Sequence, residues 1–397
     1  MRELPIIIAG AGIAGLSAAL AIARDGRRVL VLEKAPALLE AGAGIQLSPN
    51  ASRHLRRWSV LERLGGAALK PRAVVIRRGR DGAVLARLPL EDAETRWGAP
   101  YLVAHRADLQ QALRAAVADE PAIEVRLGVA VAGFAADQDG VAVGAKHGLI
   151  RLRFDGAALI GADGLWSEVR QRLELPGDLP PQAARRTAWR ALVPTAQLPE
   201  EFAAPDVNLW LGKRAHLVHY PLCGGRCVNM VAIAEDSHDE GESADFWSGT
   251  RDPAILRRAL ARWHTKAHAL LSAPAEWRSW RLFDRPPLEH WSVGRVTLAG
   301  DAAHPMLPFL AQGAAQAIED AAALELALAA NSDIAAGFKM YEQARTVRTA
   351  RLQGASRRQG DIYHMAEPAA LARDIVMRVL GARRMLARQD WIYDYRE

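Results

Sequence analysis

The chain has 397 residues and a formal net charge of +6, and half of its residues are hydrophobic. This composition is ordinary for a globular protein and excludes collagen-like, coiled-coil and disordered chains, while the length predicts two or three domains. With only two cysteines, the sequence also excludes a disulfide scaffold and a four-cysteine zinc site, and it predicts no metal site and a reducing, cytoplasmic location.

The positive charge comes almost entirely from arginine, because only six of the 51 basic residues are lysine, and the arginines are scattered. We therefore expect a solvated basic surface and no nucleic-acid partner. Residues 4–23 carry no charge and are numerous enough to cross a bilayer. Gly10, Gly12 and Gly15 argue against a spanning helix and a signal peptide, because glycine weakens a helix interior. The sequence therefore predicts no membrane association.

The chain opens with a strand at residues 4–9, a turn, a helix at 12–24 and a strand at 28–33, which is the pattern of a β-α-β unit. Hydrophobic periodicity and turn residues predict the later elements. In chain order these are a helix at 55–64, a hairpin at 71–90, a helix at 107–118, an antiparallel meander at 123–160, several strands at 187–234, helical residues at 253–270, a strand at 296–299, a long helix at 311–330 and a helical tail at 336–397.

The turn of the β-α-β unit carries a GxGxxG motif, formed by Gly10, Gly12 and Gly15. The first glycine allows a tight turn, the second lets the backbone approach a pyrophosphate, and the third allows close packing of helix and strand. Ala14, inside the motif, is expected to line the same site. Glu33 ends the second strand, where an acidic side chain binds ribose hydroxyls. The unit therefore predicts a dinucleotide site, which fits either FAD or NAD.

A second motif favours FAD. Residues 296–305 read VTLAGDAAHP, which places Asp301 directly after a strand, and a helix follows near Gly313. A carboxylate at this position can hold a ribityl hydroxyl. The positive end of a helix stabilises the negative charge that reduced flavin carries. We therefore expect FAD, bound non-covalently.

With a third motif, GADG at residues 161–164, the chain resembles the FAD-dependent aromatic monooxygenases that have the p-hydroxybenzoate hydroxylase fold. It is most similar to their salicylate hydroxylase, 3-hydroxybenzoate 6-hydroxylase and 6-hydroxynicotinate 3-monooxygenase group. The resemblance implies an α/β protein (α+β overall). A Rossmann-like FAD-binding domain at residues 1–70, 100–175 and 285–345 interleaves with a mainly antiparallel substrate domain at 71–99 and 176–284. A C-terminal helical segment follows at 346–397.

The same resemblance implies that Arg106 contacts FAD and that Asp163 organises the pyrophosphate region and the passage of NAD(P)H. NADH or NADPH would visit transiently, since the sequence has no second GxGxxG. The implied reaction uses O2 to form a C4a-hydroperoxyflavin and hydroxylates a phenolic aromatic acid, with decarboxylation when the attacked carbon bears the carboxylate. The alternative is a FAD-dependent reductase or dehydrogenase on the same scaffold. The expected oligomeric state is a monomer or a homodimer.

Residues 215–221, AHLVHYP, are typical of a strand, in which side chains two positions apart share a face. His216 and Tyr220 should therefore point together and His219 the other way. The HxxxY spacing is similar to that of the 3-hydroxybenzoate and 6-hydroxynicotinate enzymes. It implies that His216 takes the proton of the substrate hydroxyl while Tyr220 helps to hold the ring. The alternative is that His216 is a buried strand histidine. Gln46 and Tyr101 are further pocket candidates.

The two cysteines, Cys223 and Cys227, lie far from the first β-α-β unit and have C-x3-C spacing. Disulfide oxidoreductases of the flavoprotein class carry CxxC near that unit. We therefore expect both residues to be ordinary strand and turn cysteines.

Overall fold

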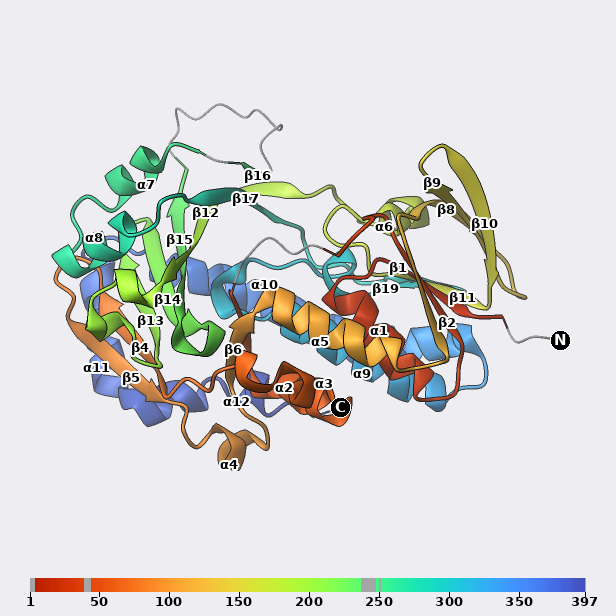
Figure 1. Cartoon of the computed structure of the whole chain (residues 1–397), viewed down its shortest axis with the longest axis horizontal. Coiled ribbons are helices and arrows are strands. Elements are labelled where there is room, and N and C mark those ends of the chain that lie inside the picture. Colours follow the sequence, from red (N-terminus) through yellow and green to blue (C-terminus); the bar gives the residue numbers. More distant parts are fainter. Residues whose placement is uncertain (1–3, 39–43, 237–247, 250, 397) are drawn as a thin grey trace.

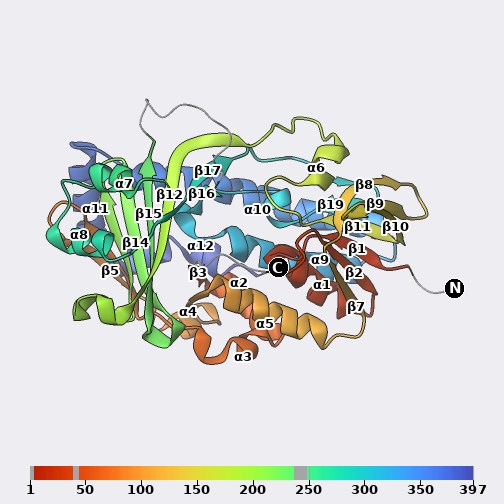
Figure 2. The same cartoon turned by 45° about the horizontal axis from the view of Figure 1, so that its top comes forward.

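The computed structural model describes residues 4–38, 44–236, 248–249 and 251–396. A parallel β-sheet lies at one end and a large, mainly antiparallel sheet at the other, and the helix α10 (Ile334–Tyr363) runs between them (Figures 1 and 2). The fold is therefore mixed α/β with helices at its C-terminal end, as predicted.

A six-stranded sheet contains the predicted β-α-β unit. Its strand order is β18-β19-β11-β1-β2-β7, and each neighbouring pair is parallel except β18 with β19. The strands are β1 (Ile6–Ala9), β2 (Val29–Glu33), β7 (Ile123–Leu127), β11 (Ala158–Gly161), β18 (Ser292–Val293) and β19 (Val296–Leu298). All residues of β1 are apolar and buried, as expected for a parallel strand that is covered on both faces.

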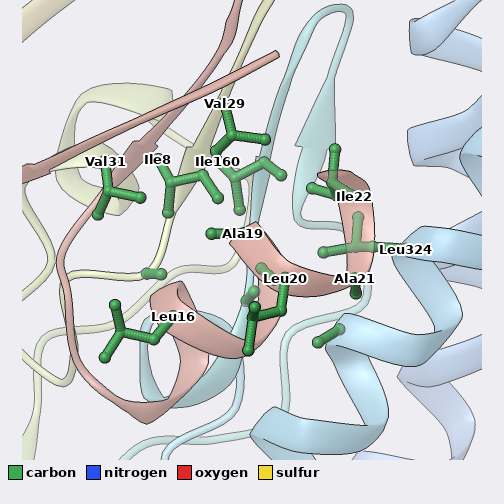
Figure 3. Packing of buried hydrophobic residues seen from close by; sticks show 14 of the residues in the cluster. Ile8, Leu16, Ala19, Leu20, Ala21, Ile22, Val29, Val31, Ile160 and Leu324 are labelled. Atoms are coloured by element: carbon green, nitrogen blue, oxygen red, sulfur yellow. The ribbon is translucent and has the colours of Figure 1, made fainter. Parts of the chain in front are cut away.

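The helix α1 (Ile13–Ala23) packs against α5 (Arg106–Ala118) and α9 (Gly313–Ala329). In the core, Ala19 of α1 lies close to Ile8 of β1, and Ile22 lies beside Leu324 of α9 (Figure 3). A small antiparallel sheet contributes Val143 to the same core. Its strands are β8 (Ala130–Ala136), β9 (Val141–His147) and β10 (Ile150–Gly156). This shared core fixes the carboxyl ends of the parallel strands, where the sequence motifs lie.

The second sheet has eight strands in the order β16-β17-β12-β15-β14-β13-β4-β5, and each neighbouring pair is antiparallel except β13 with β4. The strands are β4 (Ala73–Arg78), β5 (Val84–Pro89), β12 (Gln182–Pro194), β13 (Val207–Gly212), β14 (Ala215–Leu222), β15 (Cys227–Glu235), β16 (Ser248–Gly249) and β17 (Arg278–Asp284). A tryptophan-rich core packs α7 (Pro253–Ala259) and α8 (Thr265–Ser272) against this sheet. A separate cluster packs α11 (Ala369–Ala387) against β4, β5 and β13.

Short elements complete the connections between the sheets. They are the paired strands β3 (Gly44–Leu47) and β6 (Leu102–His105), and the helices α2 (Pro49–Arg57), α3 (Val60–Leu64), α4 (Ala93–Trp97), α6 (Glu168–Leu173) and α12 (Asp390–Tyr393). No helix in the described part of the chain is long and apolar enough to cross a membrane.

Three predicted elements differ from the structure. The ends of the predicted meander, β7 and β11, pair in parallel with β2 and β1, so only β8 to β10 form a meander. The predicted helix at 55–64 is interrupted, because Ser59 has a left-handed backbone with φ of 56°. The long helix begins at Gly313 and not at residue 311, because Ala311 is also left-handed, with φ of 53°.

The proposed start of a C-terminal segment at residue 346 falls inside α10, which runs as a single helix from Ile334 to Tyr363. Asp333 caps the start of this helix, since its carboxylate accepts hydrogen bonds from the backbone N–H groups of Ala335 and Ala336. The helix therefore joins the region of the parallel sheet to the last helices without a break, and the proposed domain boundaries stay a prediction.

Candidate active site

The GxGxxG turn has the geometry that close backbone packing requires. Gly10 has φ of +103°, and a Cβ there would lie 2.5 Å from the carbonyl oxygen of Ala162. At Gly15, a Cβ would lie 1.9 Å from the carbonyl oxygen of Gly10. Gly12, by contrast, has no atom within 4 Å of its Cβ position, and no side chain caps the helix α1 that begins after it. This open space at a helix N-terminus suits a phosphate group.

A cavity of about 390 Å³ adjoins this turn and is lined by Gly10, Gly12, Glu33 and Asp163, among others. The Glu33 carboxylate accepts hydrogen bonds from the backbone N–H groups of Ala11, at 2.7 Å, and of Ala35, at 2.8 Å. These bonds fix the carboxylate at the end of β2, and each oxygen retains a lone pair for a further donor. The position fits the ribose hydroxyls of a dinucleotide.

Asp163 presents a buried acceptor at the same cavity. Its Oδ2 accepts from the backbone N–H groups of Glu168, at 2.8 Å, and Val169, at 3.2 Å, at the start of α6. Its Oδ1 is buried and has no hydrogen-bond partner among the described residues. Burial raises the pKa of Asp163 above its ordinary value. Because buried polar atoms are rarely left unpaired, this oxygen fits a donor that a bound ligand supplies.

A second cavity, of about 300 Å³, joins the predicted flavin residues to the predicted substrate residues, and for that reason we call it the main cavity. It is lined by Gly12, Ala14, Arg106, Asp301, Gly313, His216 and Tyr220, together with other residues. The Asp301 carboxylate faces this cavity. Desolvation of the carboxylate by the surrounding protein raises the pKa of Asp301 above the ordinary value. Gly313 begins α9, which has no side-chain cap and directs its N-terminus to the same space.

Buried charges that the sequence analysis did not identify hold the Asp301 loop in place. Asp320 of α9 accepts hydrogen bonds from the backbone N–H of Gly300, at 2.8 Å, and from Arg345 Nε, at 2.8 Å, and its Oδ2 lies 2.6 Å from His304 Nε2. Burial alone would raise the pKa of Asp320, but His304 and Arg345 outweigh this effect and lower it. This carboxylate therefore ties both ends of the GDAAH turn to α9.

An apolar lobe of about 170 Å³ extends from the main cavity, with which it shares Gln46, His216 and Pro308. Tyr101 also lines the lobe, and its hydroxyl donates a hydrogen bond of 2.6 Å to Gln46 Oε1. The sequence analysis did not identify a second group of lining residues, which come from the helical tail. They are Gln359, Tyr363, Met377, Met385, Leu386, Gln389 and Tyr393.

The alternation predicted for β14 is present. His216 and Tyr220 line the main cavity. His219 lies on the other face, where its ring packs against Phe202 and Trp210 and burial lowers its pKa to about 3. Burial also lowers the pKa of His216 well below its ordinary value, and His364 adds to this effect. At neutral pH the His216 ring is therefore uncharged, and one of its two nitrogens carries no proton.

The whole chain is similar to flavoprotein hydroxylases. A family model described as FAD binding domain matches residues 3–359. The chain belongs to this FAD-binding family. Among its relatives, it is 38% identical to 3-hydroxybenzoate 6-hydroxylase 1 of Aquipseudomonas alcaligenes, over 98% of this chain and 97% of the relative. It is 36% identical to 6-hydroxynicotinate 3-monooxygenase of Bordetella bronchiseptica, over 88% and 90% of the two chains.

A solved structure of Klebsiella pneumoniae HpxO with FAD and uric acid has a TM-score of 0.84 to this chain and 27% identity, covering 97% of this chain and 95% of that one. Family membership confirms the prediction of FAD as the cofactor. The Gly12 space, the fixed Glu33 and the unpaired Asp163 oxygen are all consistent with its binding.

In this FAD-binding chain, Cys223 and Cys227 are free thiols at the adjoining ends of β14 and β15. They are absent from the linings of the two cavities that contain the predicted FAD-binding residues. No group of three or more metal-ligating side chains was found in the described part of the chain.

Gly12→Val is expected to weaken FAD binding strongly, because its side chain would enter the open space beside the N-terminus of α1. FAD content, measured from the absorbance released by acid precipitation, should fall while the far-ultraviolet circular dichroism stays unchanged. A variant that retains stoichiometric FAD would show that the pyrophosphate lies elsewhere.

Asp301→Ala is expected to weaken FAD binding by about 1.5–3 kcal/mol, the contribution of a hydrogen bond to a charged group. The carboxylate faces the main cavity, and its removal should also slow reduction by NAD(P)H. Fluorescence titration of the apoprotein and stopped-flow reduction measure the two effects. Wild-type values for both would mean that Asp301 only shapes the turn.

Proposed function

We propose that this protein is an NAD(P)H- and O2-dependent FAD monooxygenase that hydroxylates a phenolic aromatic acid of the salicylate or hydroxybenzoate type. The main observation in support is that a single cavity is lined by Asp301 and Gly313 and also by His216 and Tyr220. The named relatives are hydroxylases and monooxygenases, so the alternative of a reductase or dehydrogenase is not favoured.

FAD, when bound and reduced, supplies the activation of O2 for transfer of one oxygen atom to an aromatic carbon. Glu33 would hold the adenosine end of FAD, Asp163 would border its pyrophosphate region, and Arg106 and Asp301 would contact the part that enters the main cavity. The N-terminus of α9 at Gly313 would stabilise negative charge on the reduced ring.

The protein's own contribution to the chemistry centres on His216. A phenol becomes a far better nucleophile when its proton is removed, and a neutral imidazole in contact with the hydroxyl can accept that proton. Tyr220 has a raised pKa because of burial, so its hydroxyl stays protonated and can donate a hydrogen bond to the substrate. The apolar lobe excludes water from the reacting ring.

The size of the lobe supports a substrate with a single ring. An apolar cavity of about 150 Å³ in another protein holds benzene. The lobe here measures about 170 Å³ and is lined mainly by Ile76, Leu88, Leu209, Phe309 and other apolar side chains. We therefore propose monocyclic acids in preference to fused-ring substrates. A cytoplasmic location and a monomeric or homodimeric state are further parts of the proposal.

The decisive experiment measures NADH and NADPH oxidation together with oxygen uptake, using salicylate, 3-hydroxybenzoate, 4-hydroxybenzoate and 6-hydroxynicotinate as substrates and benzoate as the control without a hydroxyl. One of the phenolic acids should stimulate both rates, and mass spectrometry should find one atom from ¹⁸O2 in its product. Oxidation of NAD(P)H without incorporation of ¹⁸O into any of them would instead favour the reductase or dehydrogenase.

A further inference from the structure

Three titratable side chains form a connected series from the main cavity to the protein surface. His216 Nδ1 lies 2.9 Å from His364 Nε2, and His364 Nδ1 lies 3.2 Å from Glu235 Oε1. The two histidines are buried, whereas the Glu235 side chain is 27% exposed. They come from β14, from the end of α10 and from the end of β15, so only the tertiary fold brings them together.

The charge of Glu235 determines which ring nitrogens carry protons. Hydrogen bonds from His364 and Arg214 together lower the pKa of Glu235 to about 2, so the carboxylate is ionised at neutral pH. A carboxylate can only accept, so His364 Nδ1 must donate to it. The neutral His364 ring then has a bare Nε2, which accepts from His216 Nδ1. The remaining His216 nitrogen, Nε2, is therefore unprotonated and available as a base.

We propose that His364 and Glu235 are positioning residues that keep His216 in its basic tautomer and carry the substrate proton to solvent. This proposal rests on the proposed function, in which His216 accepts the phenol proton. The phenol O–H bond breaks as His216 Nε2 gains the proton. Nδ1–H of His216 then transfers its proton to His364 Nε2, and Nδ1–H of His364 transfers its proton to Glu235, which releases it to water. The net change is one proton moved from phenol to solvent, with both rings left in the Nε2–H tautomer, and the reverse transfer restores them when the product is protonated.

Other charged and titratable groups surround the series. Arg186 lies 3.8 Å from the Glu235 carboxylate and donates to Asp361, and Arg214 Nε donates to Glu235 at 2.9 Å. The Tyr363 ring packs against His216, and burial raises the pKa of that tyrosine to about 12. Because Tyr363 stays neutral, the two histidines and Glu235 are the groups that transfer the proton.

The test uses the FAD-loaded enzyme and two variants, Glu235→Gln and His364→Phe. The first removes the negative charge, and the second keeps a ring in the space but removes both nitrogens. Both should lower the hydroxylation rate by on the order of 10²-fold, the lower end of what a positioned base contributes. KM and FAD content should stay within about twofold of wild type, because none of the removed atoms lines the cavities.

The pH profile separates a role in proton transfer from a structural one. In both variants the rate should rise with pH as the substrate hydroxyl ionises by itself, whereas the wild-type rate should be nearly constant over that range. The matched control is Glu124→Gln, which makes the same substitution at an exposed carboxylate of β7 that pairs only with Arg126 at the surface in the described structure. It should retain the wild-type rate and profile.

A binding measurement separates failure of this proposal from failure of the proposed function. The ultraviolet difference spectrum of bound 3-hydroxybenzoate reports how much of it is phenolate, without turnover. Wild type should bind the phenolate at a lower pH than either variant does. Identical phenolate titrations in all three proteins would overturn the relay, whatever the enzyme hydroxylates. A clear difference in titration without ¹⁸O incorporation would instead retain the relay and reject the monooxygenase.

Discussion

His216→Ala is expected to keep its FAD and to oxidise NAD(P)H, yet to lose hydroxylation by about 10²–10⁴-fold, the usual contribution of a positioned base. The reducing equivalents should then appear as hydrogen peroxide, because the aromatic ring remains a weak nucleophile. Comparing product with NAD(P)H consumed, by chromatography and a peroxide assay, measures this uncoupling. The low pKa of His216 further predicts that the wild-type base stays unprotonated below the ordinary histidine range.

The control for this prediction is His219→Ala, three residues further along the same strand. His219 is equally buried but faces Phe202 and Trp210, away from the cavity. It should reduce stability and leave the coupling of oxygen transfer unchanged. Equal uncoupling in the two variants would contradict the assigned roles, and full coupling in His216→Ala would mean that another group activates the substrate.

Arg345→Met is expected to destabilise the protein by about 3–5 kcal/mol, as removal of one partner from a buried ion pair does. Arg345 is fully buried and forms ion pairs with both Glu319 and Asp320, so its loss leaves two carboxylates undercompensated. Because Asp320 also holds the Gly300 turn, FAD affinity should fall as well. Urea unfolding and FAD titration measure the two effects.

The pH dependence gives this prediction a definite sign. Arg345 helps to lower the pKa of Glu319 and Asp320 in the folded protein, so the stability that these carboxylates contribute is present at neutral pH and lost on acidification. The difference between variant and wild type should therefore shrink as the pH falls. The matched control is Arg358→Met on the same helix, where the side chain is exposed and the change should stay within about 0.5 kcal/mol. A constant difference at every pH would contradict the role of the two carboxylates.

The FAD-binding end of the protein could be predicted well because its signals are local. Gly10, Gly12 and Gly15 lie within one turn, and Glu33 follows after a single helix, so a β-α-β unit brings them together by short-range geometry. The same holds for the face shared by His216 and Tyr220, which follows from the two-residue period of a strand. The broad fold class followed from these motifs and from the family resemblance that they carry.

Only the tertiary structure decided which distant residues complete the site. His364 lies 148 residues from His216, Asn50 donates to Glu319 across 269 residues, and the tail supplies Tyr363 and Tyr393 to the lobe. Local periodicity marks such residues as helical but contains no information about the surface on which their helix packs. Likewise, β7 and β11 have strand character in the sequence, but their parallel pairing depends on β2 and β1. Strand pairing and helix packing depend on which distant segments bury their apolar faces against each other. The sequence alone therefore identified the motifs, whereas the fold was needed to show which distant residues lie beside them.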